Sequence, residues 1–418
     1  MKVLVIGSGG REHAIVHKLS KDKRELKLYA APGNAGIQSL ATCVPIEVDD
    51  LKGLLEFALN EKIDLTIVGP ELPLVLGIVD LFIASGLRIF GPNKKAAQFE
   101  GSKDFAKAFL MKHHIPTAKS ETHVDLEEAL KAIKRFDFPL VVKADGLAAG
   151  KGVVIAQTEA EAILAITDMM ANQVFGDAGS KVVLEAFLKG IEASILCFVD
   201  GQSIIPMQPA QDYKKAKDGD EGLNTGGMGT YSPSKVIDDV MMAKIQSDIL
   251  DPFIVGIKED EINFKGILFV GVMIDGEEIN VLEYNVRMGD PETEVTLVRL
   301  ENELLDVIDA VENETLKDID LKWSTYHAVC IIMASGGYPE TYKKGVKIFG
   351  LENAELNNSV VFHCGTKHTE GDVVTNGGRV LGVTALGTTL EKARSKAYSS
   401  LSQISFENAY FRNDIAKF

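Results

Sequence analysis

Cysteine and tryptophan are both scarce in this chain. Among 418 residues there are four Cys and one Trp, and no two cysteines form a CxxC pair. Each cysteine lies in an apolar run, which predicts buried free thiols and fits a reducing, cytoplasmic location. The four are Cys43, Cys197, Cys330 and Cys364.

Long apolar runs are also missing. No stretch is apolar and long enough to cross a bilayer, so we expect no membrane partner. The first residues, Met1-Lys2-Val3-Leu4, lead directly into a strand pattern without the apolar region and cleavage site of a signal peptide.

Positive charge is in deficit, because 44 Lys and Arg face 60 Asp and Glu and the net charge is −16. This balance argues against a nucleic-acid surface or an anionic membrane as partner. An anionic small molecule would have to be held by local Lys, Arg and backbone N–H groups. The length predicts about three domains, since a domain averages roughly 150 residues.

The first ninety residues alternate between strand and helix patterns, which predicts a parallel sheet covered by helices. Strands are expected at Lys2–Ile6, Leu26–Ala31, Leu65–Val68 and Arg88–Phe90, and helices at Arg11–Ser20, Leu51–Asn60 and Pro73–Ser85. Ligands bind such sheets where the strands end. Three loops occupy those ends: Gly7–Glu12, Ala31–Gly36 and Gly69–Glu71.

The loop Gly7–Glu12 invites a dinucleotide interpretation. Gly7 and Gly9 fit that fingerprint, but Glu12 occupies the third glycine position and no acid follows the second strand. A smaller phosphorylated molecule at the helix N-terminus is better supported, with backbone N–H groups freed by the glycines.

A glycine-rich loop, Lys143–Gly152, separates the apolar runs 138–142 and 153–156. It therefore joins two strands, unlike a P-loop, which leads from a strand into a helix. Small residues and the two lysines Lys143 and Lys151 could form a phosphate cradle. The alternative is an ordinary flexible hairpin with solvated lysines.

Two later segments also carry candidate chemistry. On a strand, Glu283, Asn285 and Arg287 alternate onto one face and would suit Mg²⁺ and phosphate, although a solvent-facing strand also alternates in this way. Residues 208–231 read as a long polar loop with the glycine run Gly226–Gly229, either functional or disordered.

Other segments carry local signals of secondary structure. Asp125 is expected to cap a helix over Asp125–Arg135, because Glu128 follows it at the capping-box spacing. A further helix is expected at Glu159–Met170, and strands are expected at Ile195–Val199 and Ser359–His363.

Taken together, these segments resemble the ATP-grasp superfamily and, within it, the family of phosphoribosylamine–glycine ligases. The motifs follow one another along the whole chain. They are GSGGREHA at Gly7, APGNAG at Ala31, DLTIVGPE at Asp64, EGSK at Glu100, VKADGLAAGKGV at Val142, FGDAG at Phe175, EASILCFVDG at Glu192, NTGGMG at Asn224, GDPET at Gly289, MASGGYP at Met333 and VVTNGGRVLGVTALG at Val373.

The resemblance implies an α/β and α+β multidomain fold. An N-terminal parallel-sheet, Rossmann-like substrate domain would occupy residues 1–100. ATP-grasp central lobes would occupy 101–325, with a mobile lid lobe at about 120–190, and a small α+β domain would occupy 326–418. We expect a monomer.

The resemblance also implies an ATP site. Lys103 and Lys143 would contact the phosphates, the loop Asp145–Gly152 would cover them, and Glu185 with the following linker would read the adenine edge. Glu192 would bind the ribose, and Glu283 and Asn285 would hold Mg²⁺ or Mn²⁺ beside Arg287. The complete ATP set is Lys103, Lys143, Gly146, Gly150, Lys151, Gly152, Glu185, Ala186, Leu188 and Glu192.

The implied reaction joins glycine to 5-phosphoribosylamine and converts ATP to ADP and phosphate through a glycyl phosphate. Catalytic roles would belong to Arg287, Asp212 and Lys143. The other substrates would be bound by Gly9, Gly10, Glu12, Asn34, Glu71, Asp212, Thr225, Gly226, Gly227 and Arg287. Within this set, Asp212 and the 224–229 segment are expected to recognise glycine, and the loop at Gly9 the phosphoribosylamine.

The chain departs from the family pattern at four places. Tyr213 and Lys215 stand in a run that is often Asp-His-Lys-Arg, Leu223 stands for Pro, and Met288 for Phe. The strand Gly266–Ile274 lacks the acidic metal ligand of many ATP-grasp enzymes, so phosphate and water would complete the metal shell. Another ATP-grasp ligase or carboxylase component, or a non-catalytic nucleotide-binding protein, remain the alternatives.

Overall fold

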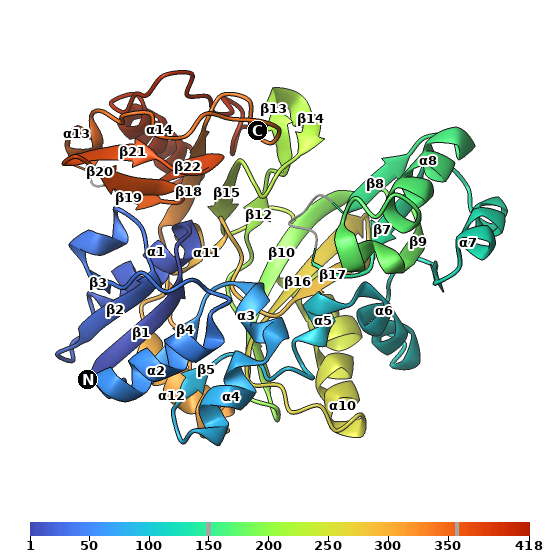
Figure 1. Cartoon of the computed structure of the whole chain (residues 1–418), viewed down its shortest axis with the longest axis horizontal. Coiled ribbons are helices and arrows are strands. Elements are labelled where there is room, and N and C mark those ends of the chain that lie inside the picture. Colours follow the sequence, from blue (N-terminus) through green and yellow to red (C-terminus); the bar gives the residue numbers. More distant parts are fainter. Residues whose placement is uncertain (148–151, 356–358) are drawn as a thin grey trace.

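A computed structural model describes residues 1–147, 152–355 and 359–418. Its N-terminal part is the expected parallel sheet, with strand order β3-β2-β1-β4-β5 (Figure 1). The strands are β1 (Lys2–Gly7), β2 (Lys27–Pro32), β3 (Thr42–Cys43), β4 (Leu65–Val68) and β5 (Ile89–Phe90). Gly7 pairs with Pro32 and Ile6 with Val68, so three strands end at one edge of the sheet.

Helices connect these strands, and one predicted helix is divided. The helices are α1 (Gly10–Leu19), η1 (Ile37–Ser39), α2 (Leu51–Glu61), α3 (Glu71–Leu76) and α4 (Ile78–Ala84). The prediction of a single helix over Pro73–Ser85 was wrong, because Gly77 adopts a left-handed φ of 96° that ends α3. Glycine reaches this conformation without a steric penalty, so the chain turns here.

The segment predicted as the lid lobe, at about 120–190, contains a four-stranded antiparallel sheet, order β6-β9-β7-β8, covered by α7 and α8. The name lid lobe is kept below for this sheet and its helices. The predicted hairpin is confirmed, since β7 and β8 pair antiparallel on either side of the glycine-rich loop. Asp125 caps α7 by accepting a hydrogen bond from Glu128 N, as the sequence predicts. The elements are β6 (Ser120–His123), α7 (Leu126–Ala132), η2 (Ile133–Arg135), β7 (Leu140–Ala144), β8 (Val153–Ala156), α8 (Glu159–Met170), η3 (Gly176–Ser180) and β9 (Val182–Ala186).

The large lobe is a second antiparallel sheet, order β11-β10-β16-β17. Its strands are β10 (Ile191–Val199), β11 (Ile204–Pro206), β16 (Gly266–Asp275) and β17 (Glu278–Asn285). Its helices are α5 (Gln98–Gly101), α6 (Lys103–Lys112), α9 (Asp239–Ile245), the π-helix η5 (Gln246–Leu250) and α10 (Asp251–Glu259). The prediction of Ile195–Val199 as a strand was too short, because β10 pairs with β16 from Ile191 onwards.

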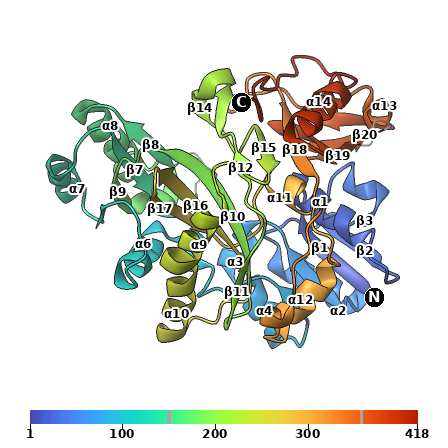
Figure 2. The same cartoon turned by 180° about the vertical axis from the view of Figure 1, so that it is seen from behind.

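The C-terminal sheet has the order β12-β15-β18-β22-β19 and carries helix α14 on one face (Figure 2). Two of its strands, β12 (Gln211–Asp212) and β15 (Gly229–Ser232), come from the segment predicted as a polar loop. That prediction was wrong in part: the segment is folded, and β15 pairs with β18 from a hundred residues further along. The remaining elements are β13 (Lys215–Lys217), η4 (Asp218–Asp220), β14 (Glu221–Asn224), β18 (His327–Ala334), α13 (Leu351–Glu355), β19 (Ser359–His363), β20 (Thr366–Thr369), β21 (Asp372–Thr375), β22 (Arg379–Gly387) and α14 (Leu390–Leu401).

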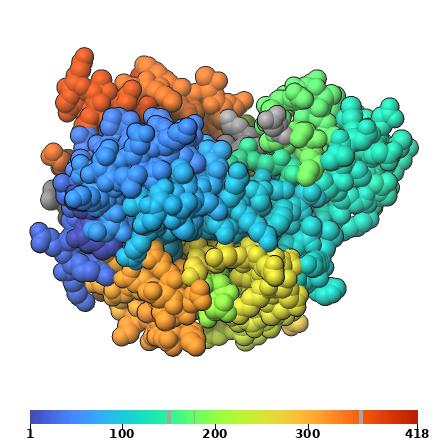
Figure 3. Space-filling view, turned by 60° about the horizontal axis from the view of Figure 1, so that its bottom comes forward, coloured from blue at the N-terminus to red at the C-terminus, as the bar shows by residue number. Residues whose placement is uncertain are grey.

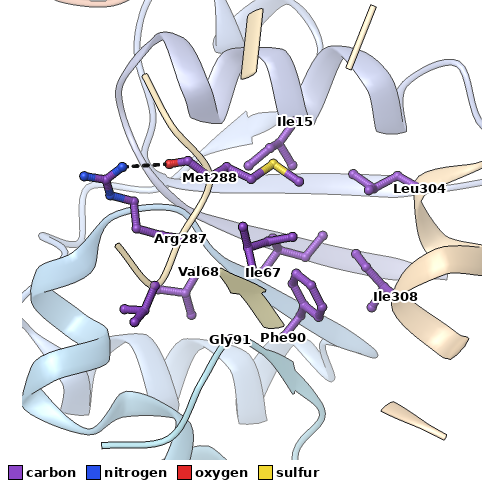
Figure 4. A pocket seen from close by; sticks show the side chains of 11 residues that line it. Ile15, Ile67, Val68, Phe90, Gly91, Arg287, Met288, Leu304 and Ile308 are labelled. Carbon is purple, nitrogen blue, oxygen red and sulfur yellow. Dashed lines mark hydrogen bonds between the residues drawn. The ribbon is translucent and has the colours of Figure 1, made fainter. Parts of the chain in front are cut away.

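An apolar core joins the N-terminal sheet to the segment that follows β17. This segment contains α11 (Thr293–Thr296), α12 (Leu304–Glu312) and η6 (Leu316–Asp318). In the space-filling view the blue N-terminal domain packs against the orange part of the chain, while the green and teal lid lobe projects to one side (Figure 3). Met288 points into this core beside Ile15 and Leu304, and Arg287 turns the opposite way (Figure 4).

Within the described residues no helix is both long and apolar enough to cross a membrane. The four cysteines are free thiols, and three of them are buried, as predicted. The exception is Cys43, which is half-buried.

Candidate active site

A cleft of about 520 Å³ lies where the lid lobe, the large lobe, the N-terminal domain and the C-terminal sheet meet. Figure 1 shows these four parts around β10 and β17. Most of the predicted site residues line this one cleft. They are Glu71, Lys103, Lys143, Gly146, Gly152, Glu185, Ala186, Leu188, Glu192, Asp212, Thr225, Gly226, Glu283, Asn285 and Arg287.

The predicted metal ligands share the cleft face of β17. Asn285 Nδ2 lies 3.3 Å from Glu283 Oε1, and Arg287 Nη2 lies 3.4 Å from Asn285 Oδ1. Burial by itself would raise the pKa of Glu283, but the charges of Lys214, Lys143 and Lys103 lower it overall. An ionised carboxylate beside an amide oxygen is a donor set that fits a hard divalent cation. In the described part of the chain no three His, Cys, Asp or Glu residues form a metal cluster, so other ligands would have to complete the shell.

Arg287 lies between two carboxylates at the floor of the cleft. Its Nη2 is 2.9 Å from Glu100 Oε1, and its Nε is 3.4 Å from Glu71 Oε2. Glu100 Oε2 also accepts a hydrogen bond from Val286 N at 2.8 Å. Burial outweighs the attraction of Arg287 and raises the pKa of Glu100 to about 7. The guanidinium is therefore fixed in place, as a phosphate-directed fork requires.

The base of the glycine-rich loop is attached to the start of α6. Ser102 caps α6 and donates a hydrogen bond to Asp145 Oδ1 at 3.1 Å, and Asp104 N donates to the same oxygen at 3.1 Å. Lys103 Nζ donates to Gly146 O at 3.0 Å. Gly146 has a φ of 137°, which disfavours any residue with a Cβ. The predicted residues Gly150 and Lys151 lie outside the described residues.

Lys143 is part of a buried triad. Its Nζ lies 2.9 Å from Glu185 Oε2, and Lys107 Nζ lies 3.1 Å from the same oxygen. The second oxygen, Glu185 Oε1, is buried and has no hydrogen-bond partner among the described residues. An unsatisfied buried acceptor is unfavourable, so a donor from a bound molecule would be stabilised there. The neighbouring wall is apolar, with Leu110, Ala118, Val141, Ile155 and Leu282 among its residues.

Another side of the cleft is lined by residues of the 212–226 segment, which are Asp212, Lys214, Asn224, Thr225 and Gly226. Asp212 Oδ1 is buried, and within the part of the chain that the structure describes it has no hydrogen-bond partner. Gly227 packs so closely against Asp212 that a Cβ there would lie 2.7 Å from this oxygen. Burial, reinforced by the charge of Glu292, raises the pKa of Asp212 well above its ordinary value. Thr225 Oγ1 donates to Lys214 O at 2.7 Å and accepts from Gly227 N at 3.0 Å, so it shapes the loop.

Lys214 connects the two sides of the cleft. Its Nζ lies 3.3 Å from Glu192 Oε2 and 4.0 Å from Glu283 Oε1. Burial would lower the pKa of Lys214, but Glu192, Glu283, Asp212 and Glu292 raise it, so the ammonium stays charged. Glu192 is thus occupied by Lys214 in this structure, although it was predicted to bind ribose.

Asp290 and Arg379 form an ion pair of 2.8 Å at the end of the cleft nearest the C-terminal sheet. Arg379 Nη1 also donates to Gly226 O at 2.7 Å and to Asp290 O at 2.8 Å. Burial would lower the pKa of Arg379, but Asp290 raises it. This arginine joins the GDPET motif to the glycine-rich turn.

The loop Gly7–Glu12 does not line the cleft, apart from Arg11. Glu12 Oε2 accepts a hydrogen bond from Gly9 N at 2.6 Å, and Asp290 Oδ2 accepts one from Arg11 N at 3.3 Å. Two carboxylates of the protein therefore already occupy the N-terminus of α1, where a phosphate was expected. Gly10 is buried against Glu294, and a Cβ at Gly9 would lie 3.1 Å from Asp290 Oδ2, so these glycines permit close packing.

Asn34 likewise has a structural environment. It donates to Ser8 O at 2.8 Å and to His363 O at 2.7 Å, and it accepts from Gly36 N and Ile37 N at 2.9 Å each. Both donors and both lone pairs of the amide are used, which leaves no capacity for the ribose hydroxyl that the sequence suggested.

Beyond Arg11 and Glu100, sequence reasoning missed five further charged residues that line the cleft: Lys107, Lys214, Asp290, Glu292 and Arg379. Lys107 lies one helical turn after Lys103, a spacing that places both on one face and could have been noticed. The other four lie within or beside segments that carried the resemblance. Their side-chain directions depend on how distant strands pair, which local patterns do not reveal.

Comparisons with known proteins agree with this architecture. Three family models match: the N domain of phosphoribosylglycinamide synthetase at residues 1–100, its ATP-grasp (A) domain at 101–293 and its C domain at 328–418. The chain is 51% identical over 416 residues to a phosphoribosylamine–glycine ligase of Caldanaerobacter subterraneus subsp. tengcongensis, covering 100% of this chain and 99% of that one. It is 47% identical to the enzyme of that name from Vibrio parahaemolyticus, covering 99% of this chain and 97% of the relative.

Solved structures give the same result. The crystal structure of phosphoribosylamine–glycine ligase from Thermotoga maritima matches with a TM-score of 0.88 and 33% identity, covering 99% of this chain and 100% of that one. The biotin carboxylase domain of Hydrogenobacter thermophilus 2-oxoglutarate carboxylase matches with a TM-score of 0.75 at 15% identity, covering 98% of this chain and 91% of that one, which shows a shared fold alone. The three matched domains and the full-length identity lead to one conclusion: the chain belongs to the phosphoribosylglycinamide synthetase family.

Proposed function

We propose that this chain ligates glycine to 5-phosphoribosylamine, giving glycinamide ribonucleotide, ADP and phosphate, a step of purine biosynthesis. It is an ATP-dependent ligase of the ATP-grasp type that uses a divalent metal, for which Mg²⁺ or Mn²⁺ is the proposed ion. We further propose a cytoplasmic monomer with three units at 1–100, 101–325 and 326–418. The lid lobe would occupy about 120–190.

One observation carries this proposal: a single cleft is lined both by a set of cations around Glu283 and Asn285 of β17 and by Asp212. Asp212 Oδ1 is buried and has no hydrogen-bond partner among the described residues. Lys214, within 4.0 Å of Glu283, connects the two sides. A nucleotide and an amino acid could therefore meet in one enclosed space, as a phosphoryl transfer followed by acyl transfer requires.

The nucleotide would lie between the lid lobe and the large lobe. Glu185 Oε1 offers an acceptor to the exocyclic amine of adenine, and Lys103, Lys143 and Arg287 offer charge to the phosphates. Glu283 and Asn285 would hold the metal, which supplies neutralisation of phosphate charge when bound. The chain's own cations position the phosphates and stabilise charge that develops in the transition state.

Glycine would bind with its ammonium at Asp212 and its carboxylate toward the γ-phosphate. A carboxylate oxygen attacks phosphorus and the bond to ADP breaks, leaving glycyl phosphate. The amine of phosphoribosylamine then attacks the acyl carbon, and phosphate leaves as the amide forms and the nitrogen loses a proton. A substrate ammonium at Asp212 would offset the burial that raises the pKa of this carboxyl.

Phosphoribosylamine would occupy the remaining part of the cleft. Glu71, Arg11, Asp290 and Arg379 line it, and they come from the N-terminal and C-terminal domains. Because Asp290 and Glu12 already occupy the N-terminus of α1, we assign the phosphate to these arginines in preference to Gly9, Gly10 and Glu12.

The test is ADP release measured with each substrate omitted in turn. We expect release to require glycine, phosphoribosylamine and a divalent ion together for sustained turnover. Asp212→Asn should raise the KM for glycine far more than the KM for ATP, whereas Asp239→Asn, an exposed residue at the start of α9, should change neither. Sustained turnover with bicarbonate in place of glycine would support the carboxylase alternative and overturn the proposal.

A further inference from the structure

The glycine side of the cleft is held from behind by the last residues of the C-terminal domain. In Figures 1 and 2 the label of the C-terminus lies next to the β13–β14 hairpin, although two hundred residues separate them in the chain. We call residues 412–416 the C-terminal clasp. The hydrogen bonds of this clasp converge on the hairpin and on Tyr213.

Arg412 is the centre of the clasp and is almost fully buried, with 1% of its side chain exposed. Its Nε and Nη2 donate to the two oxygens of Asp414 at 2.8 and 2.6 Å. Its Nη1 donates to Asp220 Oδ1 at 2.8 Å and to Lys215 O at 3.1 Å. The guanidinium therefore binds the clasp through one edge and the hairpin through the other.

Further bonds tie the same two segments together. Asn413 N donates to Asp218 Oδ1 at 2.8 Å, and Gly219 N donates to Asp414 Oδ2 at 2.8 Å. Both ends of the η4 turn are thus bonded to the clasp. The hairpin is a two-stranded sheet of its own, and such a ribbon is marginally stable unless it packs on something else.

Tyr213 transmits this attachment to the cleft. The guanidinium of Arg412 lies over the ring of Tyr213, 4.9 Å from its centre, and the Tyr213 hydroxyl accepts a hydrogen bond from Ala416 N at 3.1 Å. Tyr213 packs against the C-terminal core, while Asp212 and Lys214 on either side of it line the cleft. Alternation along an extended backbone puts neighbours on opposite faces, so the position of Tyr213 determines where Asp212 and Lys214 point.

We propose that Arg412 is a positioning residue for glycine binding, acting through Tyr213 and the β13–β14 hairpin on Asp212 and Lys214. The proposal rests on the function proposed above and extends it to residues that do not line the cleft. Tyr213 is a departure from the family pattern, and a tyrosine here supplies both the ring under Arg412 and the oxygen that Ala416 N binds.

The experiment measures KM for glycine and for ATP in Arg412→Met and Arg412→Lys. Arg412→Met removes the guanidinium, so the KM for glycine should rise about tenfold. This is roughly the effect of losing one hydrogen bond to a charged group. The ATP KM should stay within about twofold, and Arg412→Lys, which keeps the charge over Tyr213, should lie between wild type and Arg412→Met.

Arg299→Met is the matched control. Arg299 is also buried and donates to Tyr326 O at 2.7 Å and to Ser232 Oγ at 2.7 Å, but it does not touch the hairpin or line the cleft. It should lower thermal stability without changing the ratio of the two KM values. Arg412→Met and Asp212→Asn should be non-additive in glycine KM, because one acts through the other.

Equal changes in both KM values, matching those of Arg299→Met, would overturn the proposal. If Arg412→Met does not fold, the same KM measurements on Arg412→Lys and on Tyr213→Phe, which removes the oxygen bound by Ala416 N, test the proposal in its place.

A wild-type enzyme whose turnover does not depend on glycine would refute the proposed function, which is a different outcome from equal KM changes in the Arg412 variants. Amide hydrogen exchange at Gly219 and Thr225 tests separately whether Arg412 orders the β13–β14 hairpin. If the exchange rates of these amides are the same in wild type and Arg412→Lys, Arg412 does not order the hairpin.

Discussion

Arg287 Nη2 and Glu100 Oε1 lie 2.9 Å apart beneath the cleft, in a site where burial raises the pKa of the carboxyl to about 7. The folded protein therefore retains this proton between about pH 4.5 and 7, whereas the unfolded chain releases it. Stability contributed by Glu100 is full below pH 4.5 and is lost as the pH rises through 7.

Glu100→Gln should remove this pH-dependent contribution to stability, because the amide cannot ionise. Between pH 5 and 7.5 wild type should lose unfolding free energy with rising pH relative to the variant. The slopes of the two proteins should differ by at most about 1.4 kcal/mol per pH unit, and their thermal midpoints should diverge in the same direction. Differential scanning calorimetry across this range measures it. Parallel curves for the two proteins would show that Glu100 is ionised throughout.

Some of this structure follows from local patterns. The helix Glu159–Met170 and the strand Ser359–His363 were predicted to the residue, since periodicity and end signals are local. The shared face of Glu283 and Asn285 also follows from strand alternation, whereas Arg287 lines the same cleft from beyond the end of β17. These are the parts of the fold for which a residue's neighbours along the chain decide the outcome.

Other parts depend on long-range pairing. The strand β15 joins the C-terminal sheet because β18, a hundred residues later, offers it a partner, and no pattern within 208–231 reports that. Asp290 reaches the N-terminus of α1 across 279 residues. A sequence motif at a helix start predicts an anion site, but it does not say whether the protein itself supplies the anion.

If Glu283 holds the proposed metal ion, activity should depend on the charge of its side chain. Glu283→Gln keeps the shape of the side chain but removes its charge, so apparent Mg²⁺ affinity should fall and kcat should drop on the order of a hundredfold or more. Titrating activity against Mg²⁺ and Mn²⁺ gives both quantities. Glu278→Gln, at the exposed start of the same strand, serves as the control. Wild-type metal dependence in Glu283→Gln would remove this residue from the role.

The contact between α1 and β19 predicts sensitivity to acid. His13 Nδ1 accepts a hydrogen bond from His363 N at 2.8 Å, which requires an unprotonated nitrogen. Burial lowers the pKa of His13 well below its ordinary value and that of His363 to about 4. The folded state thus resists protonation that the unfolded state accepts below pH 6.5. This contribution to stability is full above pH 6.5 and is lost as the pH falls toward 4.

Thermal midpoints between pH 4.5 and 7.5 check this expectation. His363→Asn should flatten the acid side of the stability curve, because one of the titrating groups is gone. His114→Asn, at an exposed position with a left-handed φ of 55° that Asn tolerates, should leave the slope unchanged. If the thermal midpoints of wild type and both variants fall equally with decreasing pH, groups other than His363 cause the acid sensitivity.

The contacts of Lys107 indicate that this residue contributes to the selection of ATP over other nucleotides, a role that the sequence did not suggest. Its Nζ lies 3.1 Å from Glu185 Oε2 and donates to Thr117 Oγ1 at 2.7 Å, and Thr117 Oγ1 in turn donates to Val281 O at 2.7 Å. This chain of contacts anchors Glu185 through Oε2, and no described residue forms a hydrogen bond with Oε1. A free carboxylate oxygen favours the amine of adenine and repels the carbonyl of guanine.

Lys107→Met should therefore raise the KM for ATP about tenfold and reduce the preference for ATP over GTP, since Glu185 would lose one of the two lysines that hold its Oε2. Lys112→Met, at the exposed end of α6 in an ion pair with Asp260, is the matched control and should change neither quantity. Steady-state rates with both nucleotides at saturating glycine give the comparison. If Lys107→Met lowers the thermal midpoint but keeps the ratio of kcat/KM for the two nucleotides, Lys107 supports the fold and does not set the specificity.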